Sequence, residues 1–228
     1  AGALESVQNG IYDLSTNSSD FFSAILPALV ILKDGDMSAY YDRAKADIEK
    51  ALSFSKSSVF ANYLYGVLCY KQGNYDDARK YLNAAVKRFS PEISEINILL
   101  AEIGYLQGDY KKSLELSESV LKKNPQHRNA LKTGAKSAYA LGDDAKTENY
   151  VVRILVTEPE NTEYTLLRAK ILMKRQDYVR ASALLDACAR IDDTSKEYKT
   201  IFNMITQGTG AIINIILDPI LISNVGMG

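Results

Sequence analysis

The sequence predicts an all-α protein built as a helical solenoid, and three features predict it. A Tyr-x-x-Gly-Asn/Asp motif recurs with its glycine at Gly73, Gly108 and Gly142, at spacings of 108 − 73 = 35 and 142 − 108 = 34. Apolar residues on both sides of each motif recur at helical spacing. Pro125 and Pro159 follow their glycines at one common spacing (125 − 108 = 17 and 159 − 142 = 17), where a second helix has room to end. A period of this length indicates stacked helical hairpins.

The glycine of each motif is expected to form the turn between two antiparallel helices. Glycine adopts positive φ at little cost, so one helix can stop and the next can start within a short stretch of chain. Asn74 and Asp109 then offer a side-chain oxygen that can cap the second helix. A fourth copy of the motif, Lys174–Tyr178, keeps the spacing (176 − 142 = 34) but has Gln176 in place of the glycine.

The helices on either side of the first turn are expected to be amphipathic. Apolar or small residues stand at offsets of 3, 4 and 7 before the turn, which is typical of one helical face: Tyr63, Gly66, Val67 and Tyr70. A second set follows the turn: Ala78, Leu82, Ala85 and Val86. Each unit is therefore predicted to be a helix-turn-helix hairpin.

This repeated stretch resembles the tetratricopeptide repeat family over about Val59 to Asp193. The first copy carries the family's pattern most fully, through Tyr65-Gly66, Gly73, Asn74-Tyr75 and Ala78. The later copies match through Ala101, Tyr110, Val120, Gly134-Ala135, Ala169, Tyr178, Ala181 and Leu185, and depart from the pattern at Ser113 and Asp144. The resemblance implies a right-handed superhelix (an α-solenoid) of antiparallel hairpins with a concave binding face.

The chain is expected to divide into N-terminal helices at residues 1–58, four repeats at residues 59–193, and a C-terminal segment at residues 194–228. A degenerate repeat is predicted upstream, because Ala44, Ile48 and Ala51 precede Ala78, Leu82 and Ala85 by the repeat spacing (78 − 44 = 34, and likewise for the other two). Its second helix is expected over Tyr40 to Phe54 and its first over Asp20 to Lys33.

The C-terminal segment is expected to begin with a capping helix over Ser195 to Gln207. Its apolar residues recur at helical spacing: Tyr198, Ile201, Phe202 and Ile205. An apolar tail, Gly210 to Ile222, follows it. We expect the tail to be covered, and several alternatives are open. It can pack on the capping helix and the solenoid, insert in the groove of its own chain, dock on a second copy, or contact a partner or a membrane surface.

Composition limits the function. The net charge of −1 disfavours nonspecific nucleic-acid binding. The cysteines, Cys69 and Cys188, lie several repeats apart, so we expect packing residues and no disulfide. No apolar stretch reaches the roughly 18 residues of a membrane span. A start at Ala1 fits either a cytoplasmic protein or an exported one, periplasmic or lipoprotein, and the residue usage suggests a bacterial source.

Residues for chemistry are sparse. His127 is the one histidine and has no ligand neighbour at metal spacing, so no metal site is expected. Gly208-Thr209-Gly210 lacks the lysine and the preceding strand of a phosphate loop. We therefore expect no catalytic residue, no cofactor and no enzymatic activity.

The resemblance implies binding residues on the first helix of each repeat. The residues that it places in the groove are Phe60, Tyr63, Val67, Tyr70, Glu102, Tyr105, Lys136, Tyr139, Lys170 and Met173, with Glu95, Ile98, Lys132 and Leu166 at neighbouring positions. Tyr70, Tyr105 and Tyr139 form a predicted tyrosine ladder, for which helix packing is the alternative. Tyr63 and Val67 occupy the positions of the Lys and Asn that grip a carboxylate in one subclass, so that clamp is not expected.

The leading hypothesis is a non-catalytic scaffold that binds a peptide or a partner helix in its concave groove. One alternative is an exported or envelope-associated component that binds a small apolar ligand for a transport system. Another is a structural subunit of a homo-oligomer, with the tail crossing between chains. An open groove favours the first hypothesis and a closed apolar cavity favours the second.

Overall fold

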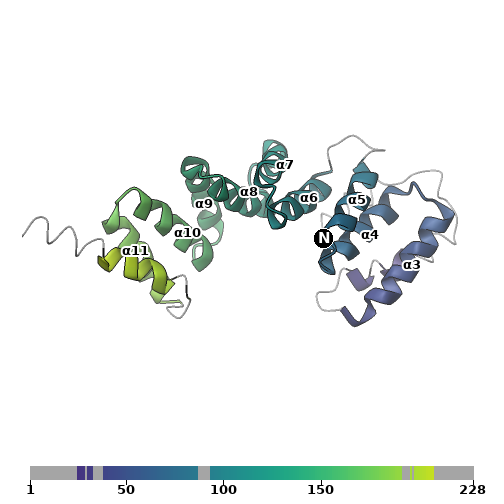
Figure 1. Ribbon diagram of the computed structural model, residues 1–228, viewed down its shortest axis with the longest axis horizontal. Helices are drawn as coiled ribbons and strands as arrows, with labels where there is room; N and C mark the ends of the chain where they lie inside the picture. Colours follow the sequence, from purple (N-terminus) through teal and green to yellow (C-terminus); the bar gives the residue numbers. More distant parts are fainter. Residues whose placement is uncertain are drawn as a thin grey trace, which may run out of the picture. The chain divides into compact units, whose positions relative to one another are not determined.

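The computed structural model describes residues 25–28, 30–32, 38–86, 93–191, 196 and 198–207 (Figure 1). All regular secondary structure in these residues is helical, so the predicted all-α class is confirmed. The elements with defined bounds are η2 (Ser38–Tyr40), α3 (Tyr41–Phe54), α4 (Val59–Lys71), α5 (Tyr75–Val86), α6 (Ser94–Leu106), α7 (Tyr110–Lys123), α8 (Arg128–Ala140), α9 (Asp144–Thr157), α10 (Thr162–Lys174) and α11 (Tyr178–Ala189).

The helices follow the predicted repeats, with α4, α6, α8 and α10 as first helices and α5, α7, α9 and α11 as second helices. Pro125 and Pro159 stand just beyond the ends of α7 and α9, as their positions predicted. The chain divides into two compact units, residues 1–133 and 134–228, which we call the N-terminal and C-terminal units.

The turns confirm the role expected of the motif glycines. Gly73, Gly108 and Gly142 have φ of +78°, +82° and +77°, in the left-handed region that glycine enters most easily. Gln176, which replaces glycine in the fourth copy, has φ of +60°. The backbone turn is therefore the same in all four hairpins, and only the last one places a side chain in a strained conformation.

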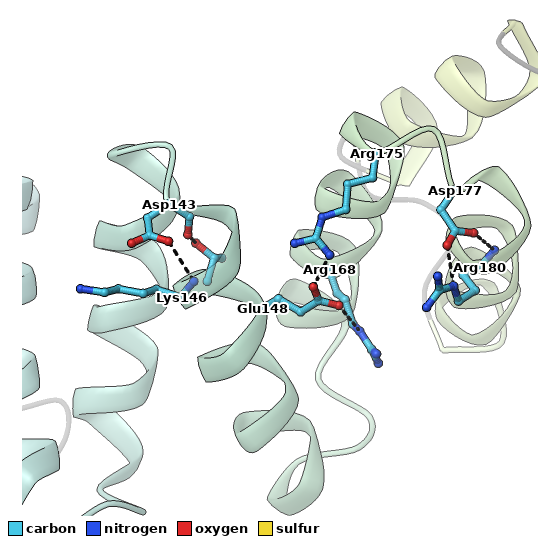
Figure 2. Close-up of polar contacts among 8 residues, drawn as sticks. Asp143, Lys146, Glu148, Arg168, Arg175, Asp177 and Arg180 are labelled. Atoms are coloured by element: carbon cyan, nitrogen blue, oxygen red, sulfur yellow. Dashed lines mark hydrogen bonds and ion pairs between the residues drawn. The ribbon is translucent and has the colours of Figure 1, made fainter.

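Three of the second helices begin with an aspartate cap. The side chain of Asp109 accepts a hydrogen bond from Lys112 N at 3.2 Å. Asp143 and Asp177 accept equivalent bonds from Lys146 N at 3.0 Å and Arg180 N at 3.2 Å (Figure 2). Each cap satisfies a backbone donor that the first helical turn leaves without a partner.

The core of the N-terminal unit differs in one respect from the predicted amphipathic face. Of the four residues expected on one face of α4, only Gly66 is buried, while Tyr63, Val67 and Tyr70 are half-buried. The fully buried residues of α4 lie on the adjoining sides: Val59, Ala61, Leu64 and Leu68. The first helix is covered by its hairpin partner α5 and by neighbouring helices, so its core spans more than one stripe.

Gly66 lies where α4 and α5 approach closely. A Cβ atom built on it would stand 2.7 Å from Leu82 Cγ and 3.3 Å from the Ala78 carbonyl oxygen. Leu82 and Ala78 are themselves completely buried. The small residue is therefore required by packing at this position.

The helix predicted as the second helix of the degenerate repeat is present as α3. Ala44, Ile48 and Ala51 of this helix are completely buried, at the positions that the repeat spacing predicted. Residues 25–28 and 30–32 are also helical, and Ile25 and Ala28 join the same apolar cluster.

The last described residues of the C-terminal unit form the expected capping helix. Residues 198–207 are helical, and Ile201 and Ile205 pack with Leu172 and Leu185 of the last hairpin. Phe202 departs from the prediction, because 48% of it is exposed. Its ring stacks on that of Tyr198. The apolar tail, residues 210–222, lies outside the described residues.

Both cysteines are buried free thiols, Cys69 on α4 and Cys188 on α11. Burial raises the pKa of the Cys69 thiol to about 11, with a further contribution from Asp77. Burial also raises the pKa of Cys188. Among the residues that the structure describes, no helix combines the length and the hydropathy needed to cross a membrane.

Candidate binding surface on the first helices

The ten predicted binding residues share one property in the structure: each is half-buried, neither part of the closed core nor fully exposed. On α4 of the N-terminal unit they are Phe60, Tyr63, Val67 and Tyr70, and on α6 they are Glu102 and Tyr105. In the C-terminal unit they are Lys136 and Tyr139 on α8, and Lys170 and Met173 on α10. This is the exposure expected of a lining residue, and their binding role stays a prediction.

Two neighbouring positions do not contribute free surface. Ile98 on α6 and Leu166 on α10 are only 4% exposed. Leu166 belongs to the apolar cluster of the last hairpin, with Ala169 and Leu185. The family register places these residues toward the groove, but their packing neighbours cover them.

A tyrosine hydrogen bond joins the first helices of two repeats in the N-terminal unit. The Tyr70 hydroxyl on α4 donates to Glu102 Oε2 on α6 at 3.0 Å. Burial raises the pKa of Tyr70, and the negative charge of Glu102 raises it further because that charge opposes formation of the phenolate. Residues of two successive repeats are thus brought together on one face.

Tyr63, two helical turns before Tyr70, has a glutamate at the same sequence offset on α6, Glu95. Burial raises the pKa of Tyr63 to about 12, and Glu95 adds to this shift. The position numbers differ by the same amount in both pairs (95 − 63 = 32 and 102 − 70 = 32). A tyrosine and a glutamate therefore recur at equivalent register positions of α4 and α6.

The tyrosines of the predicted ladder also pack within their own hairpins. The ring centroid of Tyr70 lies 6.1 Å from that of Tyr75, and the centroids of Tyr105 and Tyr110 are 5.5 Å apart. Each pair joins the end of a first helix to the start of its second helix. Helix packing therefore accounts for part of the tyrosine recurrence, while Tyr70 and Tyr105 both remain half-buried.

The first helices of the C-terminal unit are joined by charges instead. Lys136 Nζ on α8 lies 2.8 Å from Glu163 Oε1 on α10. Lys174 Nζ, at the end of α10, lies 2.8 Å from Asp144 Oδ1 and 4.6 Å from the ring centroid of Tyr139. The ring of Tyr139, the third tyrosine of the predicted ladder, is thus already covered by Lys174 of the same unit.

In both units, the second helix of one repeat contacts the next first helix through the same two repeat positions. We call this contact the repeat joint. In the C-terminal unit, Glu148 on α9 pairs with Arg175 and lies 4.0 Å from Arg168 Nε, as Figure 2 shows. In the N-terminal unit, Arg79 on α5 donates to Gln107 Oε1. Gln107 Nε2 in turn donates to Asp76 Oδ1 at 2.9 Å.

The single histidine has a structural role that its sequence context did not reveal. His127 precedes α8, and its Nδ1 accepts a hydrogen bond from Ala130 N at 3.3 Å. It therefore caps α8 as the aspartates cap the second helices. Within the described part of the chain, no three His, Cys, Asp or Glu side chains gather as metal ligands would.

The repeat pattern and the hairpin geometry agree with a known family. The family model described as "Tetratricopeptide repeat" matches residues 40–86 and 68–128. Residues 40–128 of the chain therefore match tetratricopeptide repeats. TPR repeat-containing protein MJ1428 of Methanocaldococcus jannaschii is 27% identical, in an alignment that covers 87% of this chain and 37% of that relative. The chain thus spans little more than a third of the length of this curated relative.

Solved tetratricopeptide repeat structures share the fold at low identity. YrrB, titled a TPR protein with an unusual peptide-binding site, has a TM-score of 0.70 at 14% identity, covering 89% of this chain and 98% of YrrB. PilW, titled a widely conserved type IV pilus biogenesis factor, has a TM-score of 0.66 at 16% identity, covering 92% and 96%. MamA from Desulfovibrio magneticus RS-1 has a TM-score of 0.68 at 13% identity, covering 78% and 98%.

Proposed function

We propose that this chain is a non-catalytic protein-interaction scaffold whose first helices bind an extended peptide or a partner helix. The observation that carries the proposal is the half-burial of all ten lining residues on α4, α6, α8 and α10. Half-buried aromatic side chains offer large, rigid contact area and lose little conformational entropy on binding.

The fold supports this proposal. Stacked helical hairpins present extended surfaces for partners, and YrrB is titled as having a peptide-binding site. At 14% identity that likeness concerns the fold, so the peptide groove of this chain is our proposal.

The proposed role needs no catalytic group. His127 accepts a backbone hydrogen bond at the start of α8, which gives it a structural task. The two thiols are buried, and burial raises the pKa of each, so neither is poised as a nucleophile.

A peptide-array screen followed by capture from a lysate tests the proposal. The wild-type chain is compared with a Tyr70→Ala/Tyr105→Ala variant and with a matched control, Val156→Ala, on the exposed side of the second helix α9. We expect the double variant to lose the array peptides that wild type binds and the control to keep them. Equal binding by all three proteins, each shown folded by circular dichroism, would exclude the first-helix surface.

A further inference from the structure

The second helices of the two units differ on the side that faces away from the core. The third, seventh, tenth and fourteenth positions after the turn lie on one side of a second helix, because they are spaced by 4, 3 and 4 residues. In the second repeat all of these positions are charged: Lys111, Glu115, Glu118 and Lys122. In the third repeat all of them are uncharged: Ala145, Asn149, Val152 and Val156. We call these last four residues the α9 stripe.

The α9 stripe is exposed along its whole length. Val152 is 38% exposed and Val156 is 78% exposed. Val156 and Val179, which lies near the start of α11, are the most exposed of the large apolar side chains that the structure describes. A helix face that meets water normally carries charged residues, as the same positions of α7 do. The α9 stripe is therefore a surface that suits a second apolar segment.

The one polar member of the stripe already has a partner on its own helix. Asn149 Oδ1 accepts a hydrogen bond from Arg153 Nη1 at 3.3 Å. A polar atom that is buried without a partner opposes binding, and this oxygen has its partner before anything covers it. An apolar segment can therefore cover the stripe without leaving that oxygen unpaired.

A segment of the same chain has matching chemistry. Residues 208–228 contain one charged residue, Asp218, and eight isoleucine and leucine residues between Ile212 and Ile222. This segment follows directly on the capping helix, whose last described residue is Gln207. Contact between the two apolar surfaces removes both from water, which is favourable for each.

We propose that the apolar tail, residues 210–222, packs along the α9 stripe of its own chain. The tail then covers the outer side of a second helix and leaves the first helices open to a partner. The inference does not rest on the proposed function, because the α9 stripe shares no residue with the predicted groove.

The chain after the capping helix is long enough for this arrangement. Ile201 and Ile205 of the capping helix pack with Leu172 of α10, and α10 packs against α9. Packed helices lie about 8–10 Å apart, so two such steps separate the capping helix from α9. The 217 − 207 = 10 residues from Gln207 to Leu217 span up to about 35 Å when extended. The tail can therefore reach the outer side of α9.

The capping helix itself offers a poorer surface for the tail. Its exposed large apolar residues are Phe202 and Met204, which are two positions apart. Two positions correspond to a rotation of about 200° around a helix, so these side chains point to nearly opposite sides. Phe202 also stacks on Tyr198. The capping helix thus lacks the continuous exposed stripe that α9 has.

Photo-crosslinking of the full chain tests this inference. Benzoylphenylalanine replaces Val156, and in a matched control it replaces Lys122, which is exposed at the same register position of α7. Tandem mass spectrometry of the monomer band identifies the cross-linked residues. We expect cross-links from position 156 to the tail and none to the tail from position 122.

A release variant gives a second readout. Val156→Asp places a carboxylate in the stripe, and burial of that charge under an apolar segment is unfavourable. We expect chymotrypsin to cleave within the tail about tenfold faster, because the contact of one buried apolar side chain is worth at least that factor. Lys122→Asp is the control and should leave the cleavage rate unchanged. Circular dichroism shows whether both variants keep the fold.

Other occupants of the stripe give different results, and each result would overturn the inference. Cross-links in a dimer band indicate a second copy of the chain. Tail cross-links from benzoylphenylalanine at Phe202, without any from position 156, indicate the capping helix. Absence of tail cross-links from position 156, or equal cleavage of Val156→Asp and wild type, shows that the tail does not use α9. The peptide array reads the first helices, so the scaffold proposal stands or falls separately.

Discussion

The N-terminal and C-terminal units connect successive repeats at the same register positions with opposite chemistry. At the sixth position after the turn glycine stands Arg79 in the first repeat and Glu148 in the third. Their partners, Gln107 and Arg175, each directly precede the next turn. The N-terminal unit thus pairs an arginine on the second helix with a neutral glutamine. The C-terminal unit pairs a glutamate on the second helix with an arginine.

The first helices repeat this contrast. In the N-terminal unit a phenol donates to a carboxylate, Tyr70 to Glu102, and in the C-terminal unit Lys136 pairs with Glu163. Small buried residues and left-handed turns are common to both units. The comparison teaches that the turns and the core define the repeat, while the partly exposed contacts are free to vary and can set what each unit binds.

The largest expected effect concerns a core position where the first repeat differs from the other three. At the seventh position before the turn stands Gly66 in the first repeat, while Ala169 occupies it in the fourth. We expect Gly66→Ala to destabilise the N-terminal unit by ~1–3 kcal/mol, because the new Cβ would meet Leu82 Cγ at 2.7 Å. Chemical denaturation with hydrogen exchange measures the loss unit by unit.

Gly104→Ala is the control for this prediction. A Cβ there meets the Asp109 carbonyl oxygen at 3.4 Å and Ser113 Cβ at 3.5 Å, which are ordinary contacts. Equal destabilisation by both substitutions would show that α4 and α5 do not depend on the close approach at Gly66.

The next effect concerns the turns. Gln176→Gly should stabilise the C-terminal unit by ~0.5–1 kcal/mol, because the relief of a left-handed glutamine exceeds the entropy that glycine adds to the unfolded chain. The reciprocal Gly142→Gln should destabilise it by a similar amount, although a Cβ at Gly142 meets nothing within 4 Å. Calorimetry of both variants checks the pair. Loss of stability in Gln176→Gly would mean that its side chain makes a compensating contact.

A smaller effect should separate the two joints by their salt dependence. Glu148→Gln removes the negative charge that pairs with Arg168 and Arg175. It should lower the free energy of unfolding by ~0.5–1 kcal/mol at low salt, since the pair is partly exposed. The cost should nearly vanish at about 1 M salt, where the Debye length is about 3 Å. Gln107→Ala should lower the free energy of unfolding by an amount that changes little with salt, because both hydrogen bonds of this side chain involve a neutral amide. Urea denaturation at several salt concentrations measures both losses of stability. If the two losses change equally with salt, the two joints do not differ in this way.

The smallest effect concerns the alkaline titration of Tyr63 in the N-terminal unit. The folded-state pKa of Tyr63 is about 12 and its unfolded value is near 10, so its contribution to stability is fully present below pH 10 and is lost as the pH rises through about 12. Glu95→Gln should lower the folded pKa only in part, since burial is the larger cause. Tyrosinate absorbance during a pH titration measures this shift. The control Glu163→Gln, in the C-terminal unit, should leave the tyrosine titration curve unchanged.

The period, the turns and the caps were determined by the sequence itself, because each depends on interactions between near neighbours in the chain. A glycine at the third position after a tyrosine predicts the left-handed turn, and the aspartate that follows predicts the cap at Asp109. The repeat spacing also located α3, whose buried residues repeat those of α5.

Only the tertiary structure decided which side of each first helix is open. Ile98 and Leu166 stand at groove positions in the register but are buried, and Phe202 stands at a core position but is exposed. The pairing of Tyr70 with Glu102 joins two successive repeats, and the cap at His127 depends on ring orientation. Local spacing is set by backbone geometry, which the sequence encodes directly. The environment of a side chain on a first helix is set by the residues of neighbouring repeats that cover it, and it emerges only when the hairpins pack.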